Sequence, residues 1–76
     1  MLLKQTVHFQ ARLVERNINF DHVKQAVKFP DSTETVFDGK LKSTKDLGNK
    51  SIVVIYFKDG FKSKEPVYIL VTAYYI

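Results

Sequence analysis

Three side chains near the N-terminus have the types and the spacing that phosphodiester chemistry needs. His8, Arg12 and Arg16 recur every four residues, and on an α-helix this spacing places them within about 80° of each other, on one stripe. A guanidinium can hold two phosphate oxygens in a bidentate fork. An imidazole, with an unperturbed pKa of about 6.5, can exchange a proton near neutral pH. The stripe therefore predicts an anion site in which His8 is the acid or base and the two arginines hold phosphate.

The same stripe has a second interpretation, as a solvated basic face. Glu15 follows Arg12 by three residues, a spacing at which opposite charges on a helix pair with each other. In that case the arginine is neutralised within its own helix and holds no ligand. Both interpretations stay open at this point.

Tyrosines and lysines elsewhere in the chain could complete an RNA site. Tyr74 could stack on a base or donate a hydrogen bond to phosphate, although a tyrosine buried at a sheet edge is the plainer alternative. Lys42, Lys45 and Lys50 belong to a basic run around an expected strand. They would contact RNA if that strand faces the stripe, and would otherwise keep an edge strand soluble. His22 is expected to be an ordinary surface histidine.

Length and composition narrow the class of protein. Seventy-six residues suffice for one domain, spanning 1–76. Twelve Lys and Arg against eight Asp and Glu give a net charge of +4, which favours polyanionic partners or simply aids solubility. The chain has no cysteine, and no metal, nucleotide-loop or nucleophilic-triad pattern can be assembled. An enzyme with this sequence is therefore expected to use no bound cofactor.

Hydrophobic runs in the sequence argue against a membrane location. The longest, 52–57 and 67–73, are far shorter than the ~20 apolar residues that a membrane-spanning helix needs. The N-terminus carries no small-residue cleavage site of the kind that ends a signal peptide. We therefore expect a cytoplasmic protein that does not bind membranes.

Two helices are expected at the N-terminus. Thr6 is the predicted N-cap of a helix over about 7–16, and Asn19 caps a second helix over 20–28 that Pro30 ends. The first helix has two apolar patches, which predict contacts with more than one neighbour: Val7, Ala11 and Val14, and Phe9 with Leu13.

Strands are expected after the helices, at 33–37, 40–45, 51–57 and 67–75. Asp38-Gly39 predicts a two-residue hairpin turn, and Asp59-Gly60 is expected to open a longer polar loop. The pattern predicts an α+β fold with two N-terminal helices on a three- to four-stranded antiparallel sheet.

Side-chain alternation assigns two faces to the last strand. One set should meet the helices: Val67, Ile69, Val71 and Ala73. The other set should point away, as a second core layer, a dimer face or a binding surface: Tyr68, Leu70, Thr72 and Tyr74.

Two stretches of the sequence resemble a known family. The first is His8-Phe9-x-x-Arg12-x-x-Glu15-Arg16-Asn17-Ile18, followed by Phe20-Asp21-x-Val23 and Pro30; the second is Ile52-Val53-Val54-Ile55 with the closing Val71-Thr72-Ala73-Tyr74. They are similar to a small uncharacterised family allied to the BrnT-like and RelE/ParE-like toxins of toxin–antitoxin systems. The resemblance covers nearly the whole chain in order and implies a RelE-like arrangement of two helices followed by a sheet.

The resemblance also implies a function. RelE-like toxins cleave mRNA without a metal, by attack of a ribose 2′-hydroxyl on the adjacent phosphate, and are neutralised by a cognate antitoxin. Carried over to this chain, His8 is the acid/base candidate, Arg12 and Arg16 are the phosphate holders, and Tyr74 is an auxiliary donor or a stacking group. One alternative is a non-catalytic module of the same fold that binds protein or nucleic acid. A further alternative is a homodimer, formed through the tyrosine face, that has no ligand.

Overall fold

The helices begin at the residues that the sequence predicts. In the computed structural model, which describes residues 1–76, α1 spans Val7–Glu15 and α2 spans Phe20–Lys28. The Thr6 hydroxyl accepts the N–H of Phe9 at 3.0 Å, and the Asn19 side chain accepts the N–H of Asp21 at 2.8 Å. Each cap satisfies a backbone donor that has no partner within its helix. The predictions for both helix starts are confirmed.

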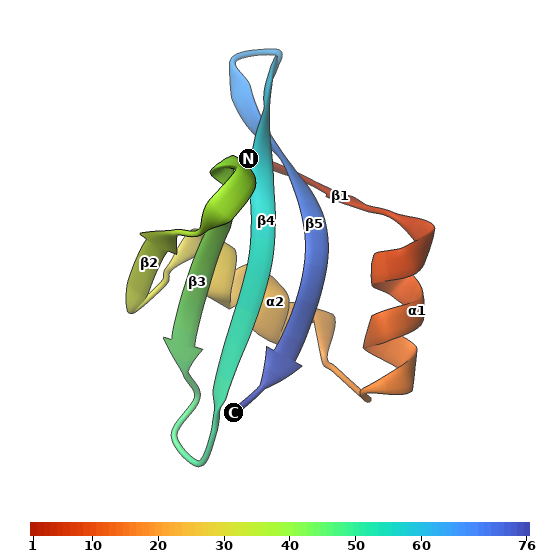
Figure 1. Cartoon of the computed structure of the whole chain (residues 1–76), viewed down its shortest axis with the longest axis vertical. Helices are drawn as coiled ribbons and strands as arrows, with labels where there is room; N and C mark the ends of the chain where they lie inside the picture. Colours follow the sequence, from red (N-terminus) through yellow and green to blue (C-terminus); the bar gives the residue numbers. More distant parts are fainter.

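The sheet has five strands in the order β1-β5-β4-β3-β2 (Figure 1). Their bounds are Leu2–Gln5 (β1), Ser32–Thr35 (β2), Leu41–Asp46 (β3), Ser51–Lys62 (β4) and Glu65–Tyr75 (β5). The α+β class is confirmed, but the all-antiparallel sheet of three to four strands is wrong. The sequence analysis missed β1, which pairs in parallel with β5 through Leu2–Val67 and Leu3–Tyr68. This pairing joins segments from the two ends of the chain, so no local sequence pattern indicates it.

One predicted turn is longer than expected, and another lies elsewhere. Asp38 and Gly39 do adopt positive φ angles of 64° and 70°, but within a five-residue connection, 36–40, that contains the short 3₁₀ turn η1 (Phe37–Gly39). Asp59-Gly60 opens no loop, because β4 continues through it to Lys62. The actual turn is Ser63-Lys64, both with positive φ. Positive φ at both residues matches the hairpin turn that the sheet twist favours, although neither residue is a usual one for it.

A β-bulge reverses the expected faces along half of β5. Ala73 pairs with Val54 and Leu70 with Tyr56, so three steps along β5 match two along β4 and Val71 is the extra residue. Leu70 and Ala73 consequently face the same side, and both are fully buried. The assignment of Val67 and Ile69 to the helix side, and of Leu70 to the other side, is therefore wrong.

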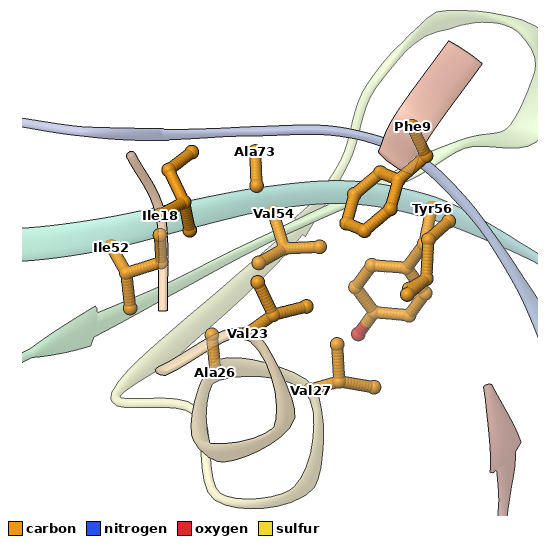
Figure 2. Close-up of a cluster of buried hydrophobic side chains, with 10 residues drawn as sticks. Phe9, Ile18, Val23, Ala26, Val27, Ile52, Val54, Tyr56 and Ala73 are labelled. Atoms are coloured by element: carbon orange, nitrogen blue, oxygen red, sulfur yellow. The ribbon is translucent and has the colours of Figure 1, made fainter. Parts of the chain in front are cut away.

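The hydrophobic core lies between the helices and one face of the sheet (Figure 2). α2 crosses behind β3 and β4, whereas α1 runs alongside β5 (Figure 1). The one buried polar residue, Ser43, is hydrogen-bonded to the hydroxyls of Tyr56 at 2.7 Å and Thr33 at 2.9 Å. Ten buried residues form the core: Phe9, Ile18, Val23, Ala26, Val27, Ile52, Val54, Tyr56, Leu70 and Ala73.

The apolar patch of α1 that contains Val7 and Val14 faces solvent. The residues Val7 and Val14 are 83% and 84% exposed. The prediction that α1 contacts more than one neighbour is confirmed, because α1 contacts both β5 and β1, but the Val7–Val14 patch is not what makes these contacts. None of the helices is long and apolar enough to span a membrane.

Candidate functional site

His8 and Arg12 touch on the outer surface of α1. The Arg12 Nε–H donates to His8 Nε2 over 3.4 Å, which is longer than a strong hydrogen bond. In this contact the Nε2 atom of His8 is the acceptor. His8 is exposed and Arg12 is partly exposed. The structure therefore presents an imidazole and a guanidinium side by side, open to solvent.

Arg12 also pairs with Glu15, as the second interpretation of the stripe expects. Arg12 Nη1 lies 2.8 Å from Glu15 Oε1, and the two side chains are 35% and 59% exposed. Exposed pairs of this kind contribute only about 0–1 kcal/mol to stability. A phosphate that met the same guanidinium could thus replace the carboxylate at small cost.

Arg16 is engaged by the sheet and not by the other two members of the stripe. Its Nη1 donates to Thr72 Oγ1 at 3.0 Å and to the backbone oxygen of Ala73 at 2.9 Å. β1 pairs only with residues 67–70 of β5, so Arg16 satisfies an edge carbonyl beyond the end of β1. The structure brings His8 and Arg12 together and gives Arg16 a positioning role between α1 and β5.

The sheet face opposite the helices, which we call the open face, lies beside this end of the stripe. Because side chains alternate along each strand, the pairing register assigns to it residues from β3, β4 and β5: Lys42, Thr44, Val53, Ile55, Phe57, Ile69, Thr72 and Tyr74. Tyr74 is partly exposed there, opposite Val53 and two residues from the Thr72 that binds Arg16. The open face therefore combines an aromatic ring, hydroxyls and a lysine with apolar side chains.

The three candidate lysines do not converge. Lys42 pairs with Glu34 at 3.5 Å and Lys45 with Asp31 at 3.5 Å. The Lys50 ammonium lies 3.9 Å from the ring centre of Tyr75. Only Lys42 shares the open face with Tyr74. Side chains alternate along β3, so Lys45 lies on the opposite face of the sheet from Lys42, and Lys50 belongs to the β3–β4 turn.

Lys45 is held in place by its ion pair with Asp31. The backbone N–H of Asp46 donates to the Asp31 carboxylate at 2.6 Å, and this bond, followed by the charge of Lys45, lowers the pKa of Asp31 below its ordinary value. Both contacts favour the ionised carboxylate. Asp31 and Lys45 thus join the start of β2 to the end of β3.

The sequence analysis missed a hydrogen-bonded cluster around His22. His22 Nδ1 lies 2.8 Å from the Tyr75 hydroxyl, which also accepts the backbone N–H of Asn19 at 3.1 Å. The interpretation of His22 as an ordinary surface histidine is wrong, because it is partly buried and joins α2 to the end of β5. Alternation along β5 already places Tyr75 on the same side as Ala73, toward the helices, but the sequence does not show that α2 brings His22 to its hydroxyl.

Nothing else in the structure gathers ligand-binding groups of the usual kinds. No three His, Cys, Asp or Glu side chains come together as metal ligands do. A shallow hollow on α2, lined by Lys24, Lys28 and Phe29 among others, is formed by residues outside the stripe and the open face.

Comparison with known proteins finds no family model that matches the chain, and no similar curated protein or solved structure. The fold and the site define a basic α+β domain with an exposed histidine–arginine pair on α1 and an open sheet face that the same stripe reaches through Arg16. The relation to BrnT-like and RelE/ParE-like toxins stays a prediction from the sequence motifs.

Proposed function

We propose that this protein is a toxin of a toxin–antitoxin system that cleaves mRNA without a metal ion. The observation that carries the proposal is the direct contact of His8 with Arg12 on an exposed surface. Arg16, at the far end of the same stripe, reaches Thr72 on the open face. RNA lying on the open face would therefore run beside a group that can exchange protons and a group that can hold phosphate.

The reaction we propose is an intramolecular transfer within the RNA. Arg12 turns from His8 to the phosphate, and the freed Nε2 of His8 takes the proton of a ribose 2′-hydroxyl. The 2′-oxygen attacks the adjacent phosphorus, and the bond from phosphorus to the 5′-oxygen breaks. The leaving 5′-oxygen takes a proton from water, and the products are a 2′,3′-cyclic phosphate and a free 5′-hydroxyl. Arg12 binds the non-bridging oxygens, where negative charge builds up in the transition state.

Other residues have smaller parts in the proposal. Tyr74 supplies a stacking surface or a hydrogen bond on the open face, and Lys42 adds positive charge beside it. The net charge of +4 favours an acidic antitoxin as the neutralising partner. Arg16 holds α1 against β5 and keeps the pair beside the open face.

The proposal is tested by incubating the purified protein with single-stranded RNA in EDTA. We expect cleavage that yields cyclic phosphate ends, and its loss in His8→Ala with the unfolding curve unchanged. Cleavage at the wild-type rate in His8→Ala would remove His8 from the mechanism.

A non-catalytic binding module is the second candidate, and one observation favours it. Arg12 is already paired with Glu15 and Arg16 with β5, so His8 has no second acid or base in contact with it. This candidate predicts RNA or protein binding without strand cleavage. It also predicts that affinity depends on Tyr74 and Lys42 while His8→Ala has no effect on it.

A further inference from the structure

The β4–β5 hairpin ends in an arm that extends beyond the rest of the molecule, at the top of Figure 1. We define the hairpin arm as residues 58–64. Within it, the pairing of Lys58 with Tyr68 and of Phe61 with Pro66 leaves one extra residue on β4, next to Gly60 with φ of 75°. A bulge of this kind increases the local twist and re-aims side chains. Neither helix covers the arm (Figure 1).

An aromatic ring is exposed on the arm beside an ammonium group. Phe61 is 65% exposed although it is a large apolar residue. The Lys58 ammonium lies 4.0 Å from the centre of its ring. The lysine lies over one face of the ring, and most of the remaining ring surface is open to solvent.

The lysines of the arm have no acidic partners. Lys58, Lys62 and Lys64 form no ion pair within the chain. The neighbouring Glu65 is neutralised by the N-terminal ammonium group at 3.0 Å, which leaves Asp59 as the one acid inside the arm. An exposed ring among unpaired ammonium groups is suited to a ligand that alternates flat bases with phosphates.

We propose that the hairpin arm binds single-stranded RNA, with Phe61 stacking on an unpaired base and the three lysines contacting neighbouring phosphates. The choice of RNA as the ligand rests on the proposed function, but the inference does not require cleavage. A second exposed ring, Phe37 at 85%, lies in the β2–β3 connection at the same end of the sheet. It offers a second stacking position to the same strand.

Other polyanionic partners fit the arm less well. In a duplex the bases stack on each other, so Phe61 would find no free base. For a lipid surface the turn should be apolar, but the two residues at the tip are Ser63 and Lys64. Single-stranded RNA can stack a base on Phe61 and place its phosphates beside the lysines of the arm.

The test is fluorescence anisotropy with the full chain and a short unstructured 2′-O-methyl RNA. The methyl group blocks the 2′-oxygen, so binding is measured without cleavage. Stacking on an aromatic ring contributes about 1–3 kcal/mol per base, so Phe61→Leu should weaken binding about 5- to 150-fold. The matched control is Phe29→Leu, because Phe29 is 68% exposed and lies beside lysines on α2; its affinity should equal that of the wild type.

The lysines are tested through the dependence of affinity on salt. Replacing Lys58, Lys62 and Lys64 by Gln should reduce the slope of log K against log salt by about 2, since each phosphate contact on a single strand contributes about 0.7. The control is the pair Lys24→Gln and Lys28→Gln on α2, which should leave the slope unchanged.

Each result decides between the proposals. An unchanged affinity in Phe61→Leu, an equal loss in Phe29→Leu, or equal affinity of the wild type for a duplex of the same sequence would overturn the role of the arm. No binding of the wild type to RNA would overturn both the arm and the proposed function. Arm-dependent binding with no cleavage of unmodified RNA would support the arm and reject the nuclease.

Discussion

The two histidines of this protein occupy opposite settings. His8 is exposed on α1 and its one side-chain contact is the long bond from Arg12. His22 is partly buried and shares the Tyr75 hydroxyl with the backbone of Asn19. A histidine that is held by a network contributes to the fold, whereas one that stands in solvent beside a cation can meet a substrate. The difference separates the residues that stabilise this protein from those that could perform chemistry.

The two arginines of the stripe should show the largest contrast. Arg12→Ala removes the group proposed to hold the phosphate, and comparable transition-state donors contribute about 10²–10³-fold to kcat. We expect a loss of that size in RNA cleavage with little change in the unfolding curve. Arg16→Ala is the matched comparison, because it removes a positioning contact and no phosphate ligand. It should reduce kcat less than Arg12→Ala does and lower the free energy of unfolding by about 1 kcal/mol. A larger loss of kcat in Arg16→Ala than in Arg12→Ala would reverse our assignment.

The network around His22 is tested by removing one hydroxyl group. Tyr75→Phe leaves His22 Nδ1 and the Asn19 N–H without their shared partner, which should destabilise the fold by about 1–3 kcal/mol. Tyr74→Phe is the control, since its ring lies on the open face and its hydroxyl has no hydrogen bond within the chain. Urea unfolding of both variants checks the prediction, and equal stabilities would contradict it.

Asp31 provides a pH-dependent test of an ion pair that we assign to the fold. Its pKa is lower in the folded protein than the ordinary value of 3.8, so the ionised carboxylate stabilises the fold above that pH. The stabilisation is lost as the pH falls through the folded pKa. The stability difference between wild type and Asp31→Asn should therefore be present at pH 7 and shrink below about pH 4. Urea unfolding at a series of pH values measures it, and a difference that grew on acidification would be the contrary result.

The smallest expected effect is an increase in RNA affinity. Glu15→Gln removes the carboxylate that competes for Arg12, and an exposed pair of this kind is worth about 0–1 kcal/mol. RNA affinity should rise by up to about fivefold. Asp21→Asn, which frees Lys24 on α2 in the same way, is a control of equal charge change away from the proposed RNA surface and should leave the affinity unchanged. A loss of affinity in Glu15→Gln would show that Glu15 takes part in binding.

Local signals in the sequence predicted the helices well. Thr6 and Asn19 accept hydrogen bonds from backbone groups two or three residues away, so the caps can be read from neighbouring residues alone. Pro30 fixes the end of α2 in the same local way. These parts of the fold were predictable because their causes lie within one turn of chain.

The features that were missed depend on contacts between distant segments. β1 forms only because β5 offers it an edge, and the bulge at Val71 shows only when β4 and β5 are aligned. The contact of His22 with Tyr75 spans 53 residues of sequence. The contact of Arg16 with Ala73 spans 57 residues. The helical spacing correctly placed His8 beside Arg12, but it could not show that the sheet engages Arg16.

One measurement compares the two histidines directly: RNA cleavage in EDTA and urea unfolding, both performed on His8→Ala and His22→Ala. General acid–base groups contribute about 10²–10⁴-fold to rate. We therefore expect His8→Ala to lose at least about 100-fold in cleavage at wild-type stability, and His22→Ala to lose stability while its folded fraction cleaves normally. Equal cleavage by wild type and His8→Ala, or no cleavage by the wild type, would contradict the account.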